Sequence, residues 1–337
     1  MKAIICSAPG TMILTGIPDA VRQEGHTLVK IRRIGICGTD MHAYGGVQPF
    51  FNYPRILGHE LAGEIAEPDP DSQAVTGDLV TILPYLSCGH CTACAAGKPN
   101  CCVTMQVLGV HQDGGMVEYL SVPTPYVVPA NGLDVDSLAL VEPLSISSHA
   151  VSRAAVMTGE YVLVAGAGPI GQGVIDFAIL AGARVIVLDV DNARLQFCRQ
   201  QPGIHAVIDG RDPDLPAQLL RITNGSMPAV VVDATGNLQA IQNGFQYLAH
   251  AGRYILVGLQ KEGITFSHPE FHKREATLMS SRNANFADFA FVMDTIRQEK
   301  LQASTYITER IAFDDTPGYF ESLAGKRSFS IKTIIEL

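Results

Sequence analysis

The sequence contains no tryptophan, which carries no functional information, and no apolar run of about 18 residues, which an α-helix would need to cross a bilayer. Positive charge is scarce: 24 lysine and arginine residues stand against 33 acidic residues, for a formal net charge of −9. The basic residues are scattered and form no stripe, so we expect neither nucleic acid nor an anionic membrane as a partner. The sequence also shows no internal repeat, low-complexity segment or charge run.

A complete export signal is missing too. The first six residues are largely apolar, but Ser7, Pro9 and Gly10 interrupt them before an h-region is complete, so we expect the protein in the cytoplasm. Eight cysteines would suit disulfides in a small secreted domain, yet five of them fall between Cys88 and Cys102 of a 337-residue chain. In a reducing compartment that clustering indicates metal binding.

One stretch, residues 161–191, has the full pattern of a dinucleotide-binding unit. An apolar strand, a glycine turn, a helix and a second strand ending in an acid follow one another, and the expected cofactor-binding residues are Gly166, Gly168, Pro169, Ile170, Gly171 and Asp189. Such a turn lets the backbone approach a pyrophosphate, and the helix N-terminus offers N–H groups to the phosphates. Asp189 lies close to the spacing at which a carboxylate accepts both ribose hydroxyl groups of NAD. Asp189 and Asp191 would repel a 2′-phosphate, so the sequence favours NAD over NADP.

The pattern of apolar residues divides the chain into parts. Residues 1 to about 143 hold short apolar runs separated by glycine, proline and aspartate, which predicts an irregular β domain. From about 144 to 282, strands and helices alternate, which predicts a doubly wound parallel sheet and the α/β class. A helix is expected over 286–300. A terminal strand at 330–335 is expected to return to the first domain.

The cysteine cluster predicts a structural metal site. Short gaps let tight loops turn the sulfur atoms inward around one tetrahedral ion, and four thiolates with no open position are typical of structural zinc. The expected ligands are Cys88, Cys91, Cys94 and Cys102. Cys101 competes for the last place, and His90 is interpreted as a bystander. An Fe–S cluster and a loop without metal are the alternatives.

A second candidate metal site is assembled from residues far apart in the sequence. Cys37, His59 and Glu142 together supply the soft, borderline and carboxylate ligands of an open catalytic zinc site. Taken singly, they are also ordinary as a buried small hydrophobe, a core histidine and a helix-start acid. His59 and Glu60 are adjacent and would point to opposite faces of a regular strand. We therefore expect His59 to bind directly and Glu60 to bind only in some states.

In this order and approximate spacing, the motifs resemble those of the zinc-dependent medium-chain alcohol and polyol dehydrogenases. They are Gly35-Ile-Cys-Gly-Thr-Asp40, Gly58-His-Glu60, the Cys88–Cys102 lobe, Glu142-Pro143 and Gly166–Gly171. The resemblance implies a GroES-like catalytic domain, residues 1–143 and 283–337, interrupted by a Rossmann NAD-binding domain, residues 144–282. It also implies two zinc ions per chain, a catalytic one on Cys37, His59 and Glu142 with Glu60 nearby and a structural one on the cysteine cluster. A homodimer or homotetramer is expected by resemblance.

The same resemblance implies further roles. Zinc at an open site lowers the pKa of water from near 16 to roughly 7, and an alcohol is acidified for the same reason before it passes hydride to the nicotinamide. Thr39 and His42 would carry the proton to solvent, although each is also ordinary in a loop or on a surface. Asp40 would orient a ligand. Arg194 would lie over the adenine or its ribose, with a surface role as the alternative.

For the substrate, the chain resembles bacterial sugar-acid dehydrogenases of the L-galactonate oxidoreductase and starvation-sensing RspB-like type. The segments that carry this resemblance are 45–50, 109–115, 269–273 and 281–284. It implies oxidation of a secondary hydroxyl group of a hexonate, such as L-galactonate to D-tagaturonate, in carbohydrate metabolism.

Several residues are expected to border the substrate: Tyr44, Gln48, Phe50, Phe51 and His111. A cation in 272–275 or at Arg282 would hold a carboxylate, with solvated charge as the alternative. Other functions also stay open, namely a dehydrogenase of a neutral polyol or a threonine-like substrate, and a catalytically silent regulatory protein that binds zinc and NAD. Zinc-free reductases of the same superfamily lack the cysteine lobe and the ligand set.

Overall fold

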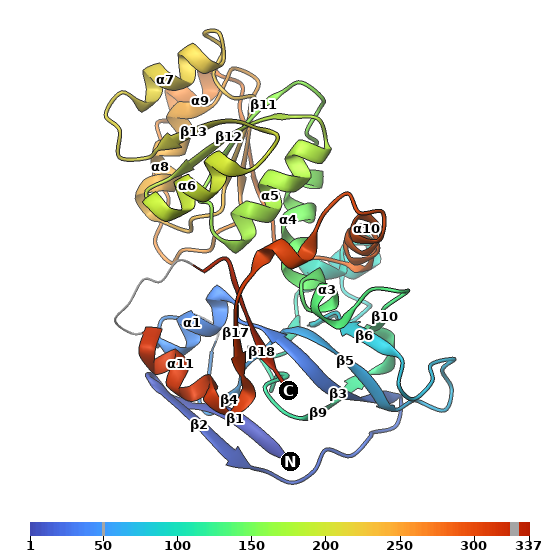
Figure 1. The fold of residues 1–337 in the computed structure, drawn as a ribbon. Helices are drawn as coiled ribbons and strands as arrows, with labels where there is room; N and C mark the ends of the chain where they lie inside the picture. The colour runs from blue at the N-terminus through green and yellow to red at the C-terminus, as the bar shows by residue number, and fades with distance from the viewer. Residues whose placement is uncertain (49–50, 324–329) are drawn as a thin grey trace. The chain divides into compact units, whose positions relative to one another are not determined.

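The structure is a computed structural model that describes residues 1–48, 51–323 and 330–337 (Figure 1). It consists of two compact units, Met1–Glu142 with Ala284–Leu337 and Pro143–Asn283. The chain passes between them at 142/143 and 283/284, whereas the sequence predicts 143/144 and 282/283. In the described residues, no helix has the length and apolar character needed to span a bilayer.

The first unit is built on two main sheets. The larger sheet has the order β10 (Val127–Pro129), β6 (Leu79–Ile82), β5 (Glu60–Glu67), β3 (His26–Gly35), β18 (Lys332–Glu336) and β17 (Ile307–Ala312), and β9 (Tyr119–Pro123) also pairs with β3. The smaller sheet has the order β2 (Thr11–Gly16), β1 (Lys2–Ala8) and β4 (Arg55–Ile56). Along β3, buried and partly exposed residues alternate for most of the strand. This alternation is the mark of a strand with one face on the core.

The terminal strand β18 completes the larger sheet. It pairs antiparallel with β3, with Ile334 opposite Gly35, and parallel with β17. The strand therefore returns to the first unit, as the sequence predicts. Its first residue, Lys332, is carried to the end of β3 where Gly35 lies.

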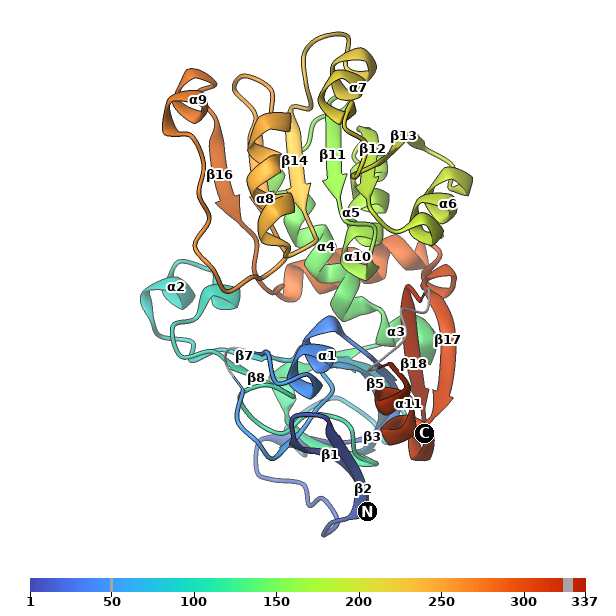
Figure 2. The ribbon, with the colours of Figure 1, turned by 90° about the vertical axis from the view of Figure 1, so that its left-hand side faces the viewer.

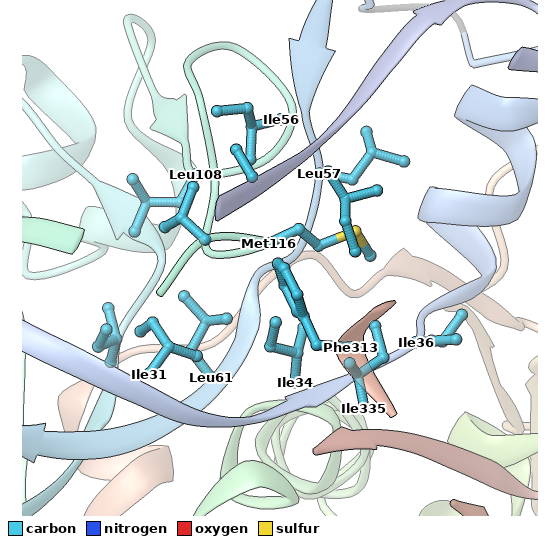
Figure 3. Packing of buried hydrophobic residues seen from close by; sticks show 14 of the residues in the cluster. Ile31, Ile34, Ile36, Ile56, Leu57, Leu61, Leu108, Met116, Phe313 and Ile335 are labelled. Atoms are coloured by element: carbon cyan, nitrogen blue, oxygen red, sulfur yellow. The ribbon is translucent and has the colours of Figure 1, made fainter. Parts of the chain in front are cut away.

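A continuous apolar core fills the first unit. Ile34, Leu57 and Met116 come from different segments and pack together, and Phe313 and Ile335 approach them from the C-terminal part of the chain (Figure 3). Full burial of one such side chain contributes about 1.5–3 kcal/mol. The core thereby fixes the segment that follows Leu57, which carries the two predicted ligands His59 and Glu60.

The helices of the first unit are short. They are α1 (Gly38–Tyr44), α2 (Thr92–Ala95), α3 (Val135–Ala139), α10 (Phe286–Arg297) and α11 (Thr316–Leu323), and α4 (Val141–Ala154) begins in this unit. Helix α10 starts at the capping box formed by Asn285 and Asp288, and it ends three residues before the predicted position 300. Glu299 has a left-handed backbone with φ 56°, which a continuing helix does not allow.

The second unit is a parallel, doubly wound Rossmann sheet. Its strands have the order β13 (Ile204–Asp209), β12 (Arg184–Asp189), β11 (Tyr161–Ala165), β14 (Val230–Asp233), β15 (Arg253–Leu256) and β16 (Thr277–Ser280), all parallel (Figure 2). Its other helices are α5 (Pro169–Leu180), α6 (Asn192–Gln200), α7 (Leu215–Ile222), α8 (Leu238–Gly244) and α9 (His268–Lys273). The strand order reverses between β11 and β14, which is where such sheets bind nucleotides.

Candidate active site and metal centres

The register of three neighbouring strands builds the buried site. Gly35, the last residue of β3, lies opposite Glu60 on β5 and opposite Ile334 on β18. A Cβ atom at Gly35 would lie 2.0 Å from Oε2 of Glu60, so the carboxylate occupies the space that any side chain at position 35 would need. Glycine at this position is therefore required for the carboxylate of Glu60 to pass over β3.

Three of the predicted ligands come together at these strand ends. Cys37, His59 and Glu60 each offer a ligand atom, and the three atoms lie within 4.8 Å of one another. Asp40 is fully buried and accepts hydrogen bonds from the backbone N–H of Cys37 at 2.9 Å and of Gly58 at 3.3 Å. It ties the two ligand-bearing segments together, and its Oδ1 lies 3.7 Å from Nδ1 of His59.

The neighbours His59 and Glu60 reach the same cluster because His59 is not part of a regular strand. Strand β5 begins at Glu60, and Gly58 has φ 92°, a left-handed conformation that turns the chain just before it. The segment of Gly114 packs closely against this turn, since a Cβ atom at Gly114 would lie 2.3 Å from the carbonyl oxygen of Gly58. Strand alternation, on which the different roles for His59 and Glu60 were predicted, therefore does not apply.

Glu142 lies outside this three-residue group. Among the described residues, its carboxylate accepts a hydrogen bond from the hydroxyl group of Tyr85, and both side chains are buried. Its charge still acts on the site, because His59, Glu60 and Lys332 all influence its pKa. The structure thus places the predicted carboxylate next to the cluster, with a tyrosine as its hydrogen-bond partner.

Glu60 also has a cationic partner that lies far away in the sequence. The ammonium group of Lys332 lies 2.6 Å from Oε1 and 2.5 Å from Oε2 of Glu60, and it donates a third bond to the carbonyl oxygen of Ile36. Both charged side chains are almost completely buried. A buried lysine requires such partners, because burial alone would lower its pKa; here the charge of Glu60 raises the pKa of Lys332 instead.

The site concentrates negative charge. Burial by itself would lower the pKa of His59, but the charges of Cys37 and Asp40 raise it well above its usual value. Burial raises the pKa of Glu142 to about 7, against the lowering effect of His59. Acidic side chains thus gather around His59 and Lys332, and such a surplus of acidic groups suits a site for a divalent cation.

The other predicted residues of this region differ in their environment. Thr39 and His42 both lie on α1, three residues apart and thus on one helix face; Thr39 is half-buried and His42 exposed. Tyr44 is buried against Phe320, and Phe51 packs edge-on against Tyr53. Gln48 is half-buried, whereas the predicted Phe50 lies outside the described residues.

Two further predicted substrate segments have structural partners. Nδ1 of His111 lies 3.1 Å from the backbone nitrogen of Val107, within the turn that follows β8 (Gln106–Val107). In the segment 272–275 of the second unit, Arg274 pairs with Glu270 and donates to the carbonyl oxygen of Leu248.

The cysteine cluster forms a separate centre on a small lobe. The sulfur atoms of Cys88, Cys91, Cys94 and Cys102 lie within 4.8 Å of one another. Backbone N–H groups of His90 and Cys91 lower the pKa of the Cys88 thiol to about 5, whereas burial raises the pKa of the Cys94 thiol to about 11. Cys101 is exposed and lies outside the group, whereas Cys102 is buried and belongs to it.

In the second unit, the glycine turn has the close approach that a nucleotide site needs. Gly166 has φ 92°, and a Cβ atom at Gly171 would lie 1.7 Å from the carbonyl oxygen of Gly166. Pro169 and Ile170 begin α5 directly after Gly168. Oδ2 of Asp189 accepts a hydrogen bond from the backbone N–H of Ala167 at 2.6 Å, which fixes the turn to the end of β12.

Arg194 lies over this turn, since its Nη1 is 3.5 Å from the position of a Cβ atom at Gly168. The same nitrogen is 3.8 Å from Oδ2 of Asp189. Asp191 caps α6 by accepting hydrogen bonds from the backbone N–H of Ala193 and Arg194. Asp189, Asp191 and Arg194 thus surround the end of β12.

Family models match both units of the chain. The model of the alcohol dehydrogenase GroES-like domain matches residues 23–132, and that of the zinc-binding dehydrogenase matches residues 169–298. The chain is 44% identical to L-galactonate-5-dehydrogenase of Escherichia coli K12, over 93% of this chain and 92% of that protein. The chain belongs to the zinc-binding alcohol dehydrogenase family.

Other members of the family are similar over nearly the whole chain. A sorbitol dehydrogenase of Halalkalibacterium halodurans is 29% identical over 99% of both chains. The crystal structure of the dehydrogenase RspB from Escherichia coli CFT073, complexed with NADH, is 27% identical with a TM-score of 0.92, and covers 100% of this chain and 99% of that chain. The predicted family, fold class and enzyme class are confirmed: the protein is a zinc-type dehydrogenase that acts on CH–OH groups.

Both clusters of this dehydrogenase fit zinc in their chemistry. Four thiols are the usual donors of a closed tetrahedral site, and a thiol, an imidazole and a carboxylate are donors of an open one. Nδ1 of His59 is buried and, within the described part of the chain, has no hydrogen-bond partner. A buried polar atom without a partner is costly in a site without a ligand, which agrees with a metal site here.

The sequence did not reveal two side chains that contact the predicted acids, Lys332 and Tyr85. Lys332 left one signal in the sequence, because it interrupts the apolar terminal run Ile331-Lys-Thr-Ile-Ile335. A lysine in a buried strand needs a partner for its charge. Tyr85 left none, since a tyrosine between Pro84 and Leu86 is ordinary. Only the fold brings these two residues to Glu60 and Glu142.

Proposed function

We propose that this dehydrogenase oxidises a secondary hydroxyl group of a sugar acid, such as L-galactonate to D-tagaturonate, with NAD as the hydride acceptor. One observation supports this reaction type: the chain combines the buried group of Cys37, His59 and Glu60 with a Rossmann unit. The substrate class is supported by the 44% identity to L-galactonate-5-dehydrogenase.

Two zinc ions per chain are part of the proposal. The catalytic one would be held by Cys37, His59 and an acid, for which Glu60 is nearest and Glu142 adjacent. The structural one would be held by the four cysteines of the lobe. Zinc in the open site would lower the pKa of the substrate hydroxyl group and so prepare it for loss of hydride.

The remaining residues have supporting tasks. Asp40 keeps the segments of Cys37 and Gly58 in place. Lys332 holds the charge of Glu60 in the buried site. Thr39 and His42 would pass the substrate proton along one face of α1 towards solvent, from a half-buried hydroxyl group to an exposed imidazole.

The acids at the end of β12 support NAD as the cofactor. The carboxylate of Asp189 is buried and in contact with three backbone N–H groups, those of Ala167, Val190 and Asp191. A 2′-phosphate placed there would meet a fixed negative charge, whereas a ribose hydroxyl group would donate to it. We expect kcat/KM to be much higher with NAD than with NADP, and equal efficiency with the two cofactors would contradict this part of the proposal.

The test of the substrate is a panel of steady-state measurements. L-galactonate, other hexonates, sorbitol and L-threonine are compared at matched NAD, with NADH formation followed by absorbance. We expect an aldonate to give the highest kcat/KM. A neutral polyol far better than every aldonate would overturn the sugar-acid proposal and favour the second candidate, a polyol dehydrogenase, which the similarity to a sorbitol dehydrogenase supports.

Location and assembly stay predictions. The eight free cysteines agree with the reducing environment of the cytoplasm. A homodimer or homotetramer is expected, and light scattering of the purified protein measures the mass directly.

A further inference from the structure

A two-stranded ribbon links the cysteine lobe to the active site. Strand β7 (Tyr85–Leu86) pairs antiparallel with β8 (Gln106–Val107), with Tyr85 opposite Val107. The four-cysteine group lies in the segment between these two strands, so that Cys88 follows β7 and Cys102 precedes β8. The backbone N–H of Cys88 also donates to the sulfur of Cys102 at 3.3 Å. A metal ion held there would close the ribbon at its far end.

The near end of this ribbon touches the active site through one hydroxyl group. Tyr85 is 6% exposed and Glu142 is 3% exposed, and the hydroxyl group of Tyr85 donates to Oε1 of Glu142. A buried carboxylate needs a donor, because an unpaired one bears the full cost of its lost hydration. Tyr85 supplies this donor, and its backbone is held in place by the pairing of β7 with β8.

We propose that Tyr85 is a positioning residue, through which the ribbon closed by the cysteine cluster holds the carboxylate of Glu142 beside the catalytic metal ligands. The proposal rests on the proposed function in one respect, namely that the group of Cys37, His59 and Glu60 holds the catalytic metal. It gives the cysteine lobe a task in catalysis besides local stability. Its steps are two: the lobe orders the ribbon, and the ribbon orders Glu142.

The first test replaces Tyr85 by phenylalanine, which keeps the ring and removes the donor. We expect kcat/KM for the best substrate of the panel to fall about 10- to 100-fold, the usual effect of losing a partner that orients a group of a metal site. We also expect dipicolinate to extract the catalytic metal ion faster by a similar factor. The KM for NAD should stay unchanged.

A matched control is Tyr126→Phe. The hydroxyl group of Tyr126 accepts a hydrogen bond from the backbone N–H of Ser87, the residue directly after β7, at 2.9 Å, and among the described residues it makes no bond to Glu142. This variant should keep the wild-type extraction rate of the catalytic metal. Equal effects of Tyr85→Phe and Tyr126→Phe on that rate would overturn the proposal, and the thermal midpoint of each variant shows that both are folded.

A double-mutant cycle separates positioning from mere packing. If Tyr85 acts through Glu142, then Tyr85→Phe should change kcat/KM less than about twofold when Glu142→Ala has already removed the acceptor. Full additivity would mean that Tyr85 acts by another route. The ordering of the ribbon by the lobe is tested in the same way. Cys94→Ser should lower kcat/KM in the wild-type background but cause little further loss in the Tyr85→Phe background. Additive losses of kcat/KM would exclude the ribbon as the link.

Failure of the proposed function gives a different result from failure of this proposal. If the wild-type enzyme prefers an alcohol other than a sugar acid, the substrate assignment fails and the cycle is measured with that alcohol. If it turns over no alcohol of the panel, the extraction rates of the metal in the wild type, Tyr85→Phe and Tyr126→Phe still decide the role of Tyr85.

Discussion

The two cysteine-containing centres of the first unit are built in opposite ways. The cysteine lobe draws its four sulfur donors from one short segment, Cys88–Cys102, whose only α-helix in the described structure is the four-residue α2. The buried centre draws Cys37, His59 and Glu60 from the ends of different strands. A closed set of four like donors from one loop is typical of a structural metal ion. An open, mixed set of donors at the ends of strands is typical of a metal ion that binds substrate.

The two centres also differ in what orders them without metal. The sheet, the apolar core and the pair of Glu60 and Lys332 hold the buried centre. The lobe has no comparable core, since only Asn100 and Cys102 are buried among the residues Cys88–Cys102. Loss of metal should therefore abolish activity at the buried centre without unfolding it, whereas it should disorder the cysteine lobe.

The largest expected effect is that of Cys37→Ser. Replacing the thiolate removes the strongest donor of the open site, so kcat should fall by about a thousandfold or more, which corresponds to several kcal/mol of lost transition-state stabilisation. The thermal midpoint should change little, because the sheet orders the site. Atomic absorption should show the loss of one of the two proposed zinc ions. An unchanged kcat in this variant would show that Cys37 is not a ligand of the catalytic metal ion.

The next largest effect is expected for Lys332→Met. It leaves the carboxylate of Glu60 buried without its counter-ion, and breaking a buried pair by removing one partner costs about 3–5 kcal/mol. Urea unfolding measures this free energy. Lys2→Met is the matched control, because Lys2 pairs with Asp314 at the surface and its loss should leave the unfolding midpoint unchanged. Equal midpoints for both variants would contradict the structural importance of the buried pair.

A smaller and more local effect is expected for Cys94→Ser. The lobe should lose its metal ion and become a site of cleavage by trypsin near Lys98, while the remainder of the unit stays folded. Mass spectrometry of the fragments locates the cleavage. Wild-type resistance to trypsin in this variant would show that the lobe is ordered without metal, and the contrast between the two centres would then be lost.

The smallest effect is expected for Cys101→Ser. Cys101 adjoins Cys102 in the sequence but is exposed and lies outside the four-sulfur group. Metal content, thermal midpoint and kcat should all match the wild type. Loss of one metal ion would mean that Cys101 is a ligand after all.

Local patterns carried most of what the sequence predicted. The strands β11 and β12, the glycine turn and the cysteine cluster each lie within a short segment, so spacing and periodicity were enough to find them. The return of β18 to the first unit was also predictable, because an apolar terminal strand must pair. Its partner β3 was not, since nothing in a sequence specifies register between distant strands.

The remainder of the buried site depends on such non-local geometry. Lys332 meets Glu60 across a separation of 272 residues, and Tyr85 meets Glu142 across 57. The relation of His59 to Glu60 was predicted from a regular strand, but the left-handed Gly58 and the start of β5 at Glu60 changed it. Backbone turns next to a ligand are therefore where reasoning from strand periodicity fails.

The pair of Glu60 and Lys332 has a consequence for the order in which the chain folds during synthesis. At about 5–20 residues per second, a ribosome adds Lys332 roughly 14 to 54 seconds after Glu60. During that time the whole second unit emerges and can form its own sheet, while β5 and β3 carry an acid that has no counter-ion. The buried pair therefore cannot form before β18 has been synthesised, so the site is completed only when this strand joins the larger sheet.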